Sequence, residues 1–123
     1  MTKILIADDK ATSRELIRMV LEGDGYAISE ASDGIEALRY AHEFEPDLII
    51  LDLHMPGVDG YGVVLELRRD GRFAAIPIMA LTASAMQGDR ERALAAGFDS
   101  YVSKPIALSA LRAEVERLLN RSR

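Results

Sequence analysis

Several side chains in this sequence could do chemistry together: two adjacent carboxylates, a third carboxylate, a hydroxyl and an amine. They belong to Asp8, Asp9, Asp52, Thr82 and Lys104. Three carboxylates placed close together repel one another and raise one another's pKa, and a divalent cation removes that conflict. Mg²⁺ prefers oxygen ligands, typically one or two carboxylates together with waters and phosphate oxygens. These residue types therefore indicate Mg²⁺-dependent phosphoryl chemistry, provided that the fold brings them together.

The metal ligands can be assigned one by one. We expect Asp9 and Asp52 to bind Mg²⁺ directly and Asp8 to bind it mostly through water. The backbone carbonyl of His54, in the loop that follows Asp52, would complete the ligand set. The His54 side chain is expected to be exposed.

The remaining groups suit phosphoryl transfer. A carboxylate that keeps a free oxygen can attack phosphorus and form an aspartyl phosphate. The reaction depends chiefly on positioning and charge neutralisation, which Mg²⁺ and the Lys104 ammonium would supply. The Thr82 hydroxyl could bond a phosphoryl oxygen, and the small Ala83 beside it leaves room for a donor or a water.

Five short runs predict the strands that position these residues. Three of them are almost wholly apolar, as in strands buried on both faces of a parallel sheet, and a more polar run predicts an edge strand at Ala27–Ala31. The five predicted strands are Lys3–Ala7, Ala27–Ala31, Leu48–Leu51, Ile76–Leu81 and Ser100–Ser103.

Segments with helical periodicity separate the strands. An apolar stripe around Ile17 predicts the first helix, with Thr12–Glu15 as a capping box, and Gly23 and Gly97 are expected to follow helix ends. Helices are also predicted around Ile35–His42, Tyr61–Arg69, Met86–Ala96 and Leu108–Leu119. The fourth has only Met86 and Leu94 as large apolar residues, so we expect it to be weakly packed and able to move.

Strand and helix therefore alternate about five times, which predicts a doubly wound α/β domain with a parallel sheet. Sites in such folds lie at the carboxyl ends of the strands. Asp8-Asp9 follow the first strand, Asp52 lies at the end of the third, Thr82-Ala83 end the fourth and Lys104 follows the fifth, so all are expected at one edge.

The chain resembles the receiver domains of two-component response regulators over essentially its whole length. The resemblance rests on Asp8-Asp9, Asp52, Thr82-Ala83, Tyr101, Lys104-Pro105 and the loop Met55–Gly60. It implies a flavodoxin-like (βα)5 fold with strand order 2-1-3-4-5.

The resemblance also implies residue roles. Asp52 would accept the phosphoryl group, Asp8 and Asp9 would serve the metal, and Thr82 and Lys104 would sense the phosphoryl group. The rotamer of Tyr101 would report the state of the switch, and the Lys104–Pro105 peptide bond would be cis.

The stretches Ala83–Asp89 and Ser103–Ile106 are similar to stand-alone receivers of the cell-cycle type and to receivers fused to hybrid histidine kinases. We expect one receiver domain over residues 1–123 without an output domain, acting as a monomer or weak dimer. A receiver excised from a hybrid histidine kinase is the alternative.

The resemblance implies protein partners. A histidine kinase or histidine phosphotransfer protein would donate the phosphoryl group, docking near Thr12, Ser13, Leu16, Pro105 and Ile106. A downstream protein would read the surface formed by the fourth helix, Tyr101 and the last helix.

Composition excludes several other classes. A chain of 123 residues fits one domain, and the absence of cysteine excludes a disulfide framework, a thiolate zinc site and a cysteine nucleophile. The net charge of -5 argues against a nucleic-acid partner. With no signal peptide and no long apolar run, these features predict a cytoplasmic protein that does not span a membrane.

We expect a switch that catalyses only its own phosphorylation and dephosphorylation, and three other functions are alternatives to it. A phosphatase of the haloacid-dehalogenase type would have Asp-x-Asp-x-Thr, whereas Asp8 and Asp9 are adjacent. A flavin binder would need aromatic stacking residues, and only 6% of the chain is aromatic. A phosphate-independent pseudo-receiver would lack part of the acidic set.

Overall fold

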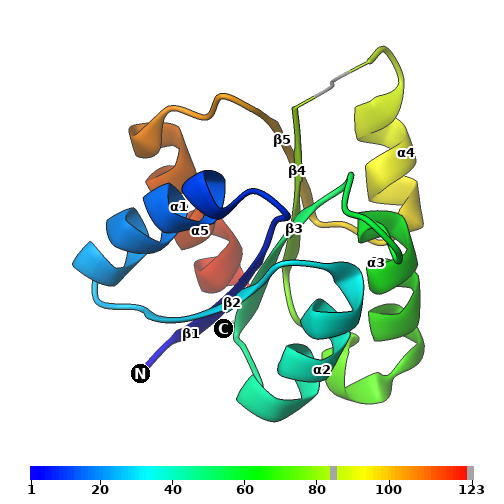
Figure 1. Cartoon of the computed structure of the whole chain (residues 1–123), viewed down its shortest axis with the longest axis horizontal. Helices are drawn as coiled ribbons and strands as arrows, with labels where there is room; N and C mark the ends of the chain where they lie inside the picture. The colour runs from blue at the N-terminus through cyan, green and yellow to red at the C-terminus, as the bar shows by residue number, and fades with distance from the viewer. Residues whose placement is uncertain (84–85, 122–123) are drawn as a thin grey trace.

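The computed structural model describes residues 1–83 and 86–121 and shows a five-stranded sheet between two layers of helices (Figure 1). Every strand pair is parallel, and the order β2-β1-β3-β4-β5 confirms the predicted topology. The strands are β1 (Lys3–Ala7), β2 (Ala27–Ala31), β3 (Leu48–Asp52), β4 (Ile78–Thr82) and β5 (Ser100–Ser103).

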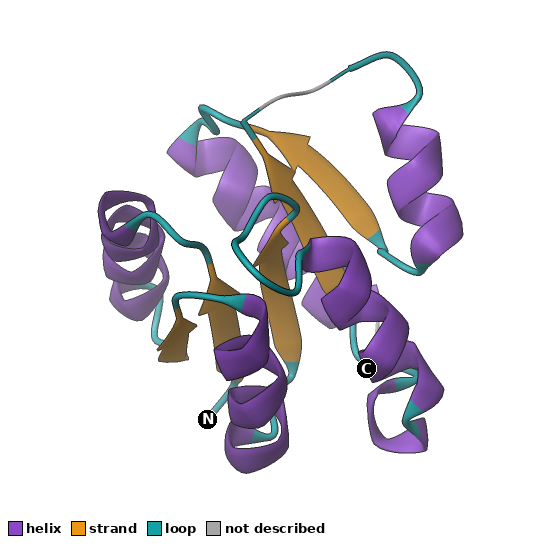
Figure 2. Cartoon of the chain, turned by 45° about the vertical axis from the view of Figure 1, so that its right-hand side comes forward, coloured by secondary structure: helices purple, strands orange, loops and turns teal. Residues whose placement is uncertain are grey.

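Helices cover both faces of the sheet (Figures 1 and 2). Helices α1 (Ala11–Gly23) and α5 (Leu108–Arg121) lie on the first face. Helices α2 (Gly34–Phe44), α3 (Gly60–Arg69) and α4 (Asp89–Ala96) lie on the second, with a short 3-10 turn, η1 (Gly71–Phe73), after α3. Within the described ranges, no helix is long and apolar enough to cross a bilayer.

The sheet separates two apolar cores. Successive strand residues point to opposite faces, so Ile4 and Ile6 of β1 pack with α1 and α5, while Leu5 and Ala7 pack with α2 and α3. The central strands must therefore be apolar at nearly every position. That requirement explains the continuous run Leu48–Leu51 that predicted β3.

Two strands extend further toward their carboxyl ends than predicted. The ladder continues because the Leu53 N–H donates to the Leu81 carbonyl (2.8 Å) and the Lys104 N–H to the Thr82 carbonyl (2.7 Å). Asp52 and Thr82 are consequently the last residues of β3 and β4, which confirms their expected place at the ends of these strands.

The predicted start of the fourth strand, at Ile76, was wrong. The Ile76 N–H donates to the Phe73 carbonyl at 3.3 Å and so belongs to the turn after η1. Pro77 has no N–H to donate, and β4 begins at Ile78.

Two predictions about α1 were wrong. The helix begins at Ala11 and its N-cap is Lys10, so Thr12 lies inside the helix and forms no capping box. The helix runs through Gly23, and the left-handed residue after it is Gly25, with φ of 94°.

Helix α4 is shorter and more weakly packed than predicted. It begins at Asp89, not Met86, because Gly88 before it has φ of 88° and interrupts the helical path. Ala93 is its buried residue, whereas Met86 is 71% exposed and Leu94 is 40% exposed. Gly97 ends the helix as predicted, with φ of 120°.

Arg68, in the last turn of α3, connects the segments at the amino-terminal edge of β4 and β5. Its Nη1 donates to the carbonyls of Phe73 (2.7 Å) and Ile76 (2.8 Å), and its Nε to the carbonyl of Gly97 (2.9 Å). Its Nη2 pairs with Asp99 Oδ2 at 2.8 Å. One side chain thus holds the carboxyl end of α4 against the body of the protein.

We predict that Arg68→Met lowers the free energy of unfolding by about 2–4 kcal/mol, because four backbone acceptors, including the Ala74 carbonyl, and one carboxylate lose their charged donor. The neighbouring Arg69 is 67% exposed and, among the described residues, pairs with Glu66 alone, so Arg69→Met should change stability by no more than about 0.5 kcal/mol. Urea unfolding measures both. Equal effects of the two substitutions would contradict this account.

Candidate functional site

The carboxyl ends of four strands bring the chemically competent side chains to one edge of the sheet. Asp8 follows β1, Asp52 ends β3, Thr82 ends β4 and Lys104 follows β5. Asp8, Asp52 and Thr82 are buried, and Asp9 is exposed. The strand register alone therefore assembles most of this group from segments far apart in the sequence.

Three carboxylates form a tight cluster at this edge. One carboxylate oxygen each from Asp8, Asp9 and Asp52 lie within 4.8 Å of one another. The Lys104 ammonium lies beside two of them, with Nζ 2.6 Å from Asp8 Oδ2 and 3.8 Å from Asp52 Oδ2. One positive charge is thus shared by carboxylates that carry up to three negative charges.

This imbalance shifts the acidity of the two buried carboxyls in opposite directions. Burial, with a smaller contribution from the nearby Asp8, raises the pKa of Asp52 to about 6 against the opposing effects of the His54 N–H and Lys104. Burial alone would also raise the pKa of Asp8. Hydrogen bonds from Lys104, the Lys10 N–H and Ser13 outweigh burial and lower it.

Backbone groups fix the two buried carboxylates. The Lys10 N–H donates to Asp8 Oδ1 and the His54 N–H to Asp52 Oδ1, both at 3.0 Å. Gly60, at the start of α3, packs directly against β3, since a Cβ there would lie 2.6 Å from the Asp52 carbonyl oxygen. Glycine is therefore needed for α3 to begin this close to the cluster.

The donor set suits a hard divalent cation. Every member of the cluster offers a carboxylate oxygen and none offers a histidine nitrogen or a cysteine sulfur. Oxygen-only sites favour Mg²⁺ over metals that select softer ligands. Within the described parts of the chain, the Asp9 carboxylate accepts no hydrogen bond, so its oxygens are available to a metal.

Tyr101, on β5, lies apart from the acidic cluster. Its hydroxyl is buried and has no hydrogen-bond partner among the described residues. Burial raises the pKa of this hydroxyl, with smaller contributions from Asp89 at the start of α4 and from Tyr61. A buried polar group without a partner is costly, so this position can be sensitive to a rearrangement of α4.

Other expected features concern the backbone and the loops. The Lys104–Pro105 peptide bond is cis, and the His54 side chain is exposed. The metal role of the His54 carbonyl stays a prediction. Ser84 and Ala85, within the stretch Ala83–Asp89, lie outside the described residues.

The sequence analysis did not identify Arg14, whose guanidinium contacts the backbone of the acidic cluster. Arg14 of α1 donates from Nη1 to the Asp8 carbonyl at 2.6 Å and pairs through Nε with Glu30 Oε1 of β2 at 3.3 Å. Arg18, one turn later on α1, pairs with the other oxygen of Glu30 at 3.4 Å. The i, i+4 spacing of these arginines was the available signal, but their common partner on β2 was not visible in the sequence.

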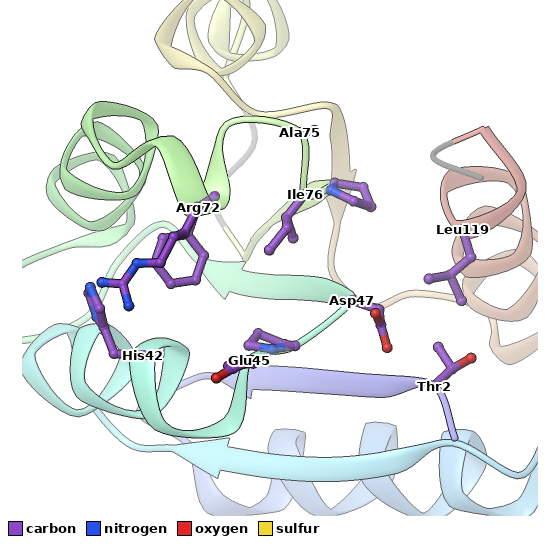
Figure 3. A pocket seen from close by; sticks show the side chains of 11 residues that line it. Thr2, His42, Glu45, Asp47, Arg72, Ala75, Ile76 and Leu119 are labelled. Atoms are coloured by element: carbon purple, nitrogen blue, oxygen red, sulfur yellow. The ribbon is translucent and has the colours of Figure 1, made fainter.

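A groove of about 630 Å³ lies at the opposite edge of the sheet (Figure 3). Its lining includes Thr2, Asp47 and Pro77, which precede β1, β3 and β4, together with His42 and Arg72. It therefore lies at the amino-terminal ends of the strands and shares no lining residue with the acidic cluster.

The fold and the acidic edge define a class of parallel α/β domain with a carboxylate site at the carboxyl ends of its strands, and comparison with known proteins gives the family. The family described as the response regulator receiver domain matches residues 4–116. The chain belongs to this family, whose members are signalling domains of two-component systems rather than conventional enzymes. Mg²⁺ binding and phosphotransfer are general to the family.

Curated relatives include both long and short proteins. The chain is 42% identical over 120 residues to the probable transcriptional regulator ycf27 of Guillardia theta. This match covers 98% of this chain but only 46% of that protein. The chain thus spans about half the length of the first curated relatives it matches. It is 40% identical to the polar-differentiation response regulator DivK of Brucella ovis, over 88% of this chain and 89% of that protein.

Solved structures agree with this assignment. The receiver domain of the sensor histidine kinase PA1611 from Pseudomonas aeruginosa, which holds a magnesium ion in its active-site cleft, is 35% identical with a TM-score of 0.89, over 97% of this chain and 98% of that one. The chemotaxis protein CheY4 of Vibrio cholerae is 30% identical with a TM-score of 0.90, over 96% of this chain and 98% of that one.

The raised pKa of Asp52 predicts a gain in stability when its charge is removed. In the metal-free protein the Asp52 carboxyl ionises near pH 6 when folded and near pH 4 when unfolded. Ionisation of Asp52 therefore destabilises the fold, and this destabilisation is complete above pH 6 and absent below pH 4. Asp52→Asn should therefore raise the free energy of unfolding by about 1–3 kcal/mol at pH 7.5.

Urea unfolding in the presence of a chelator measures this difference, and it should disappear at pH 4. Asp47→Asn, at the other end of β3 and exposed, is the matched control. A variant at Asp52 that is less stable than wild type at pH 7.5 would contradict the electrostatic account of the site.

Proposed function

We propose that this receiver takes a phosphoryl group on Asp52 from the phosphohistidine of a histidine kinase or a histidine phosphotransfer protein. Asp8, Asp9 and Asp52 would hold Mg²⁺, with the His54 carbonyl as a further ligand. The observation that carries the proposal is the buried Asp52 carboxylate, with the Lys104 ammonium 3.8 Å away and the exposed Asp9 in the same cluster.

The transfer is a displacement at phosphorus. A carboxylate oxygen of Asp52 forms the new O–P bond while the N–P bond of the donor breaks, and the imidazole leaves with the bonding electron pair. With a pKa of about 6, Asp52 is mainly ionised at neutral pH and can act as the nucleophile. When bound by Asp8, Asp9 and Asp52, Mg²⁺ would supply charge neutralisation on the phosphoryl oxygens.

Lys104 and Thr82 would serve the transferred group. The Lys104 ammonium already neutralises Asp8, at 2.6 Å, and would follow the new negative charge on Asp52. The Thr82 hydroxyl, at the end of the adjacent strand, would donate to a phosphoryl oxygen. Loss of the phosphoryl group by attack of water is the only further reaction expected, so the protein catalyses its own phosphorylation and dephosphorylation.

The output would be a changed protein-binding surface on α4, β5 and α5. Helix α4 is held mainly by Ala93 and, beyond its end, by the Arg68 contact to Gly97. Its N-cap, Gly88, provides no side-chain cap. Movement of Thr82 toward the phosphoryl group, with adjustment of Tyr101, would therefore meet little resistance at the amino end of α4.

The donor would dock beside the acidic edge. Leu16 is 52% exposed, and Thr12 and Pro105 are also exposed, as a docking surface requires. Ser13 and Ile106 are half-buried between them. A downstream protein, rather than a nucleic acid, would read the switched surface, with the receiver as a monomer or weak dimer in the cytoplasm.

That residues 1–123 form the whole natural protein stays a prediction. The intact mass of the protein isolated from its native source would test it.

We predict that Asp52→Asn abolishes phosphorylation by acetyl phosphate with Mg²⁺, because the nucleophilic oxygen is replaced by an amide. Wild type and Asp47→Asn, which makes the same substitution at the opposite end of β3, should both gain the mass of one phosphoryl group. Intact-protein mass spectrometry measures the change. Equal labelling of Asp52→Asn and wild type would refute the assignment of Asp52.

We also predict that phosphorylation alters amide hydrogen exchange in α4 and β5 more than in α2. Helix α2 is the control because the Asp33 side chain caps it by accepting from the Glu36 N–H at 2.8 Å, and two of its alanines are fully buried. Exchange is compared with and without acetyl phosphate. A change of equal size in α2, or none in α4, would contradict the proposed output surface.

A further inference from the structure

The carbonyl group of Asp8 has a charged donor of its own. Arg14 Nη1 donates to this oxygen at 2.6 Å, across the first turn of α1. The Asp8 N–H donates to the Ala31 carbonyl of β2 at 3.1 Å, and both Asp8 carboxylate oxygens are hydrogen-bonded, to Lys10 N–H and Lys104. The polar atoms of Asp8 are therefore all held by neighbouring elements.

The carbonyl of Asp8 and the N–H of Asp9 belong to one planar peptide group. Fixing the direction of that carbonyl also fixes the plane from which the Asp9 side chain departs. Because the Asp9 carboxylate accepts no hydrogen bond from the described residues, its place beside Asp8 and Asp52 depends on this backbone orientation.

Arg14 is itself held in place. Its side chain is only 18% exposed, and Glu30 on the edge strand β2 accepts from its Nε at 3.3 Å. Glu30 also pairs with Arg18, so its carboxylate faces both arginines of α1. Glu30 of β2 thus contacts Arg14, and Arg14 in turn contacts the peptide group that joins Asp8 and Asp9.

We propose that Arg14 is a positioning residue that holds the Asp8–Asp9 peptide group so that the Asp9 carboxylate faces the metal site, with Glu30 as its support. The inference rests on the proposed Mg²⁺ site. For the Mg²⁺ affinity after loss of Arg14, it predicts a change opposite in sign to the one that simple electrostatics predicts. Removing a nearby positive charge should strengthen the binding of a cation, whereas loss of a positioning residue should weaken it.

The test is a Mg²⁺ titration of the ¹⁵N-labelled full chain, starting metal-free and followed by NMR. Arg14→Met, which retains an apolar stem, should weaken Mg²⁺ binding about tenfold or more, in the range that loss of an outer-shell partner of a ligand produces. Arg14→Lys should recover part of the affinity, because one ammonium lacks the fork that reaches both Asp8 and Glu30. In the metal-free protein, Arg14→Met should also shift the Asp9 amide resonance.

Arg18→Met is the matched control, since Arg18 shares Glu30 but has no bond to the Asp8 carbonyl. Its Mg²⁺ affinity should stay within about twofold of wild type. Glu30→Gln should weaken binding in the wild-type background and have little further effect in Arg14→Met, because Glu30 acts through Arg14. Urea unfolding of each metal-free variant separates loss of affinity from loss of fold.

Two failures can be told apart. If wild type binds no Mg²⁺, the proposed function fails. If wild type binds Mg²⁺ and Arg14→Met binds it equally or more tightly, or if Arg18→Met weakens binding as much, the role of Arg14 is refuted while the proposed function stands. If Arg14→Met does not fold, the shorter and uncharged Arg14→Gln replaces it, and its Mg²⁺ affinity is compared with that of wild type and Arg18→Met in the same way.

Discussion

One unbalanced group of charges at the carboxyl edge of the sheet constrains the elements around it. Three carboxylate oxygens lie within 4.8 Å, and a single ammonium, Lys104, contacts two of the three carboxylates. Burial makes the imbalance costly, since charge without a partner is poorly tolerated away from water. A divalent cation and then a phosphoryl group would each redistribute this charge, which makes the edge sensitive to both.

The surrounding elements divide into a firm support and a loosely held part. The acidic residues are held by the β-ladder, by the close packing of Gly60 against β3 and by the contacts of Arg14. Arg68 holds the carboxyl end of α4, while its amino end has no side-chain cap. A change of charge at a fixed site can therefore be expressed as movement at the amino end of α4.

The sequence predicted the sheet and its acidic edge well because both follow from local patterns. Apolar runs fixed which residues form the strands, and the parallel topology brought Asp8, Asp52, Thr82 and Lys104 to one edge. Local signals failed where longer contacts decide: the turn after η1 delays β4 to Ile78, and Gly88 delays α4 to Asp89. The supporting contacts of Arg14 and Arg68 join distant segments, which no local pattern reveals.

The central claim is that the folded protein binds a divalent cation through this acidic group, and linkage between binding and folding tests it directly. The free energy of unfolding of wild type should rise with Mg²⁺ concentration, by about 1.4 kcal/mol for each tenfold increase above the dissociation constant. KCl at matched ionic strength should not reproduce this rise. A stability that is flat with Mg²⁺, or that follows KCl alone, would contradict the account.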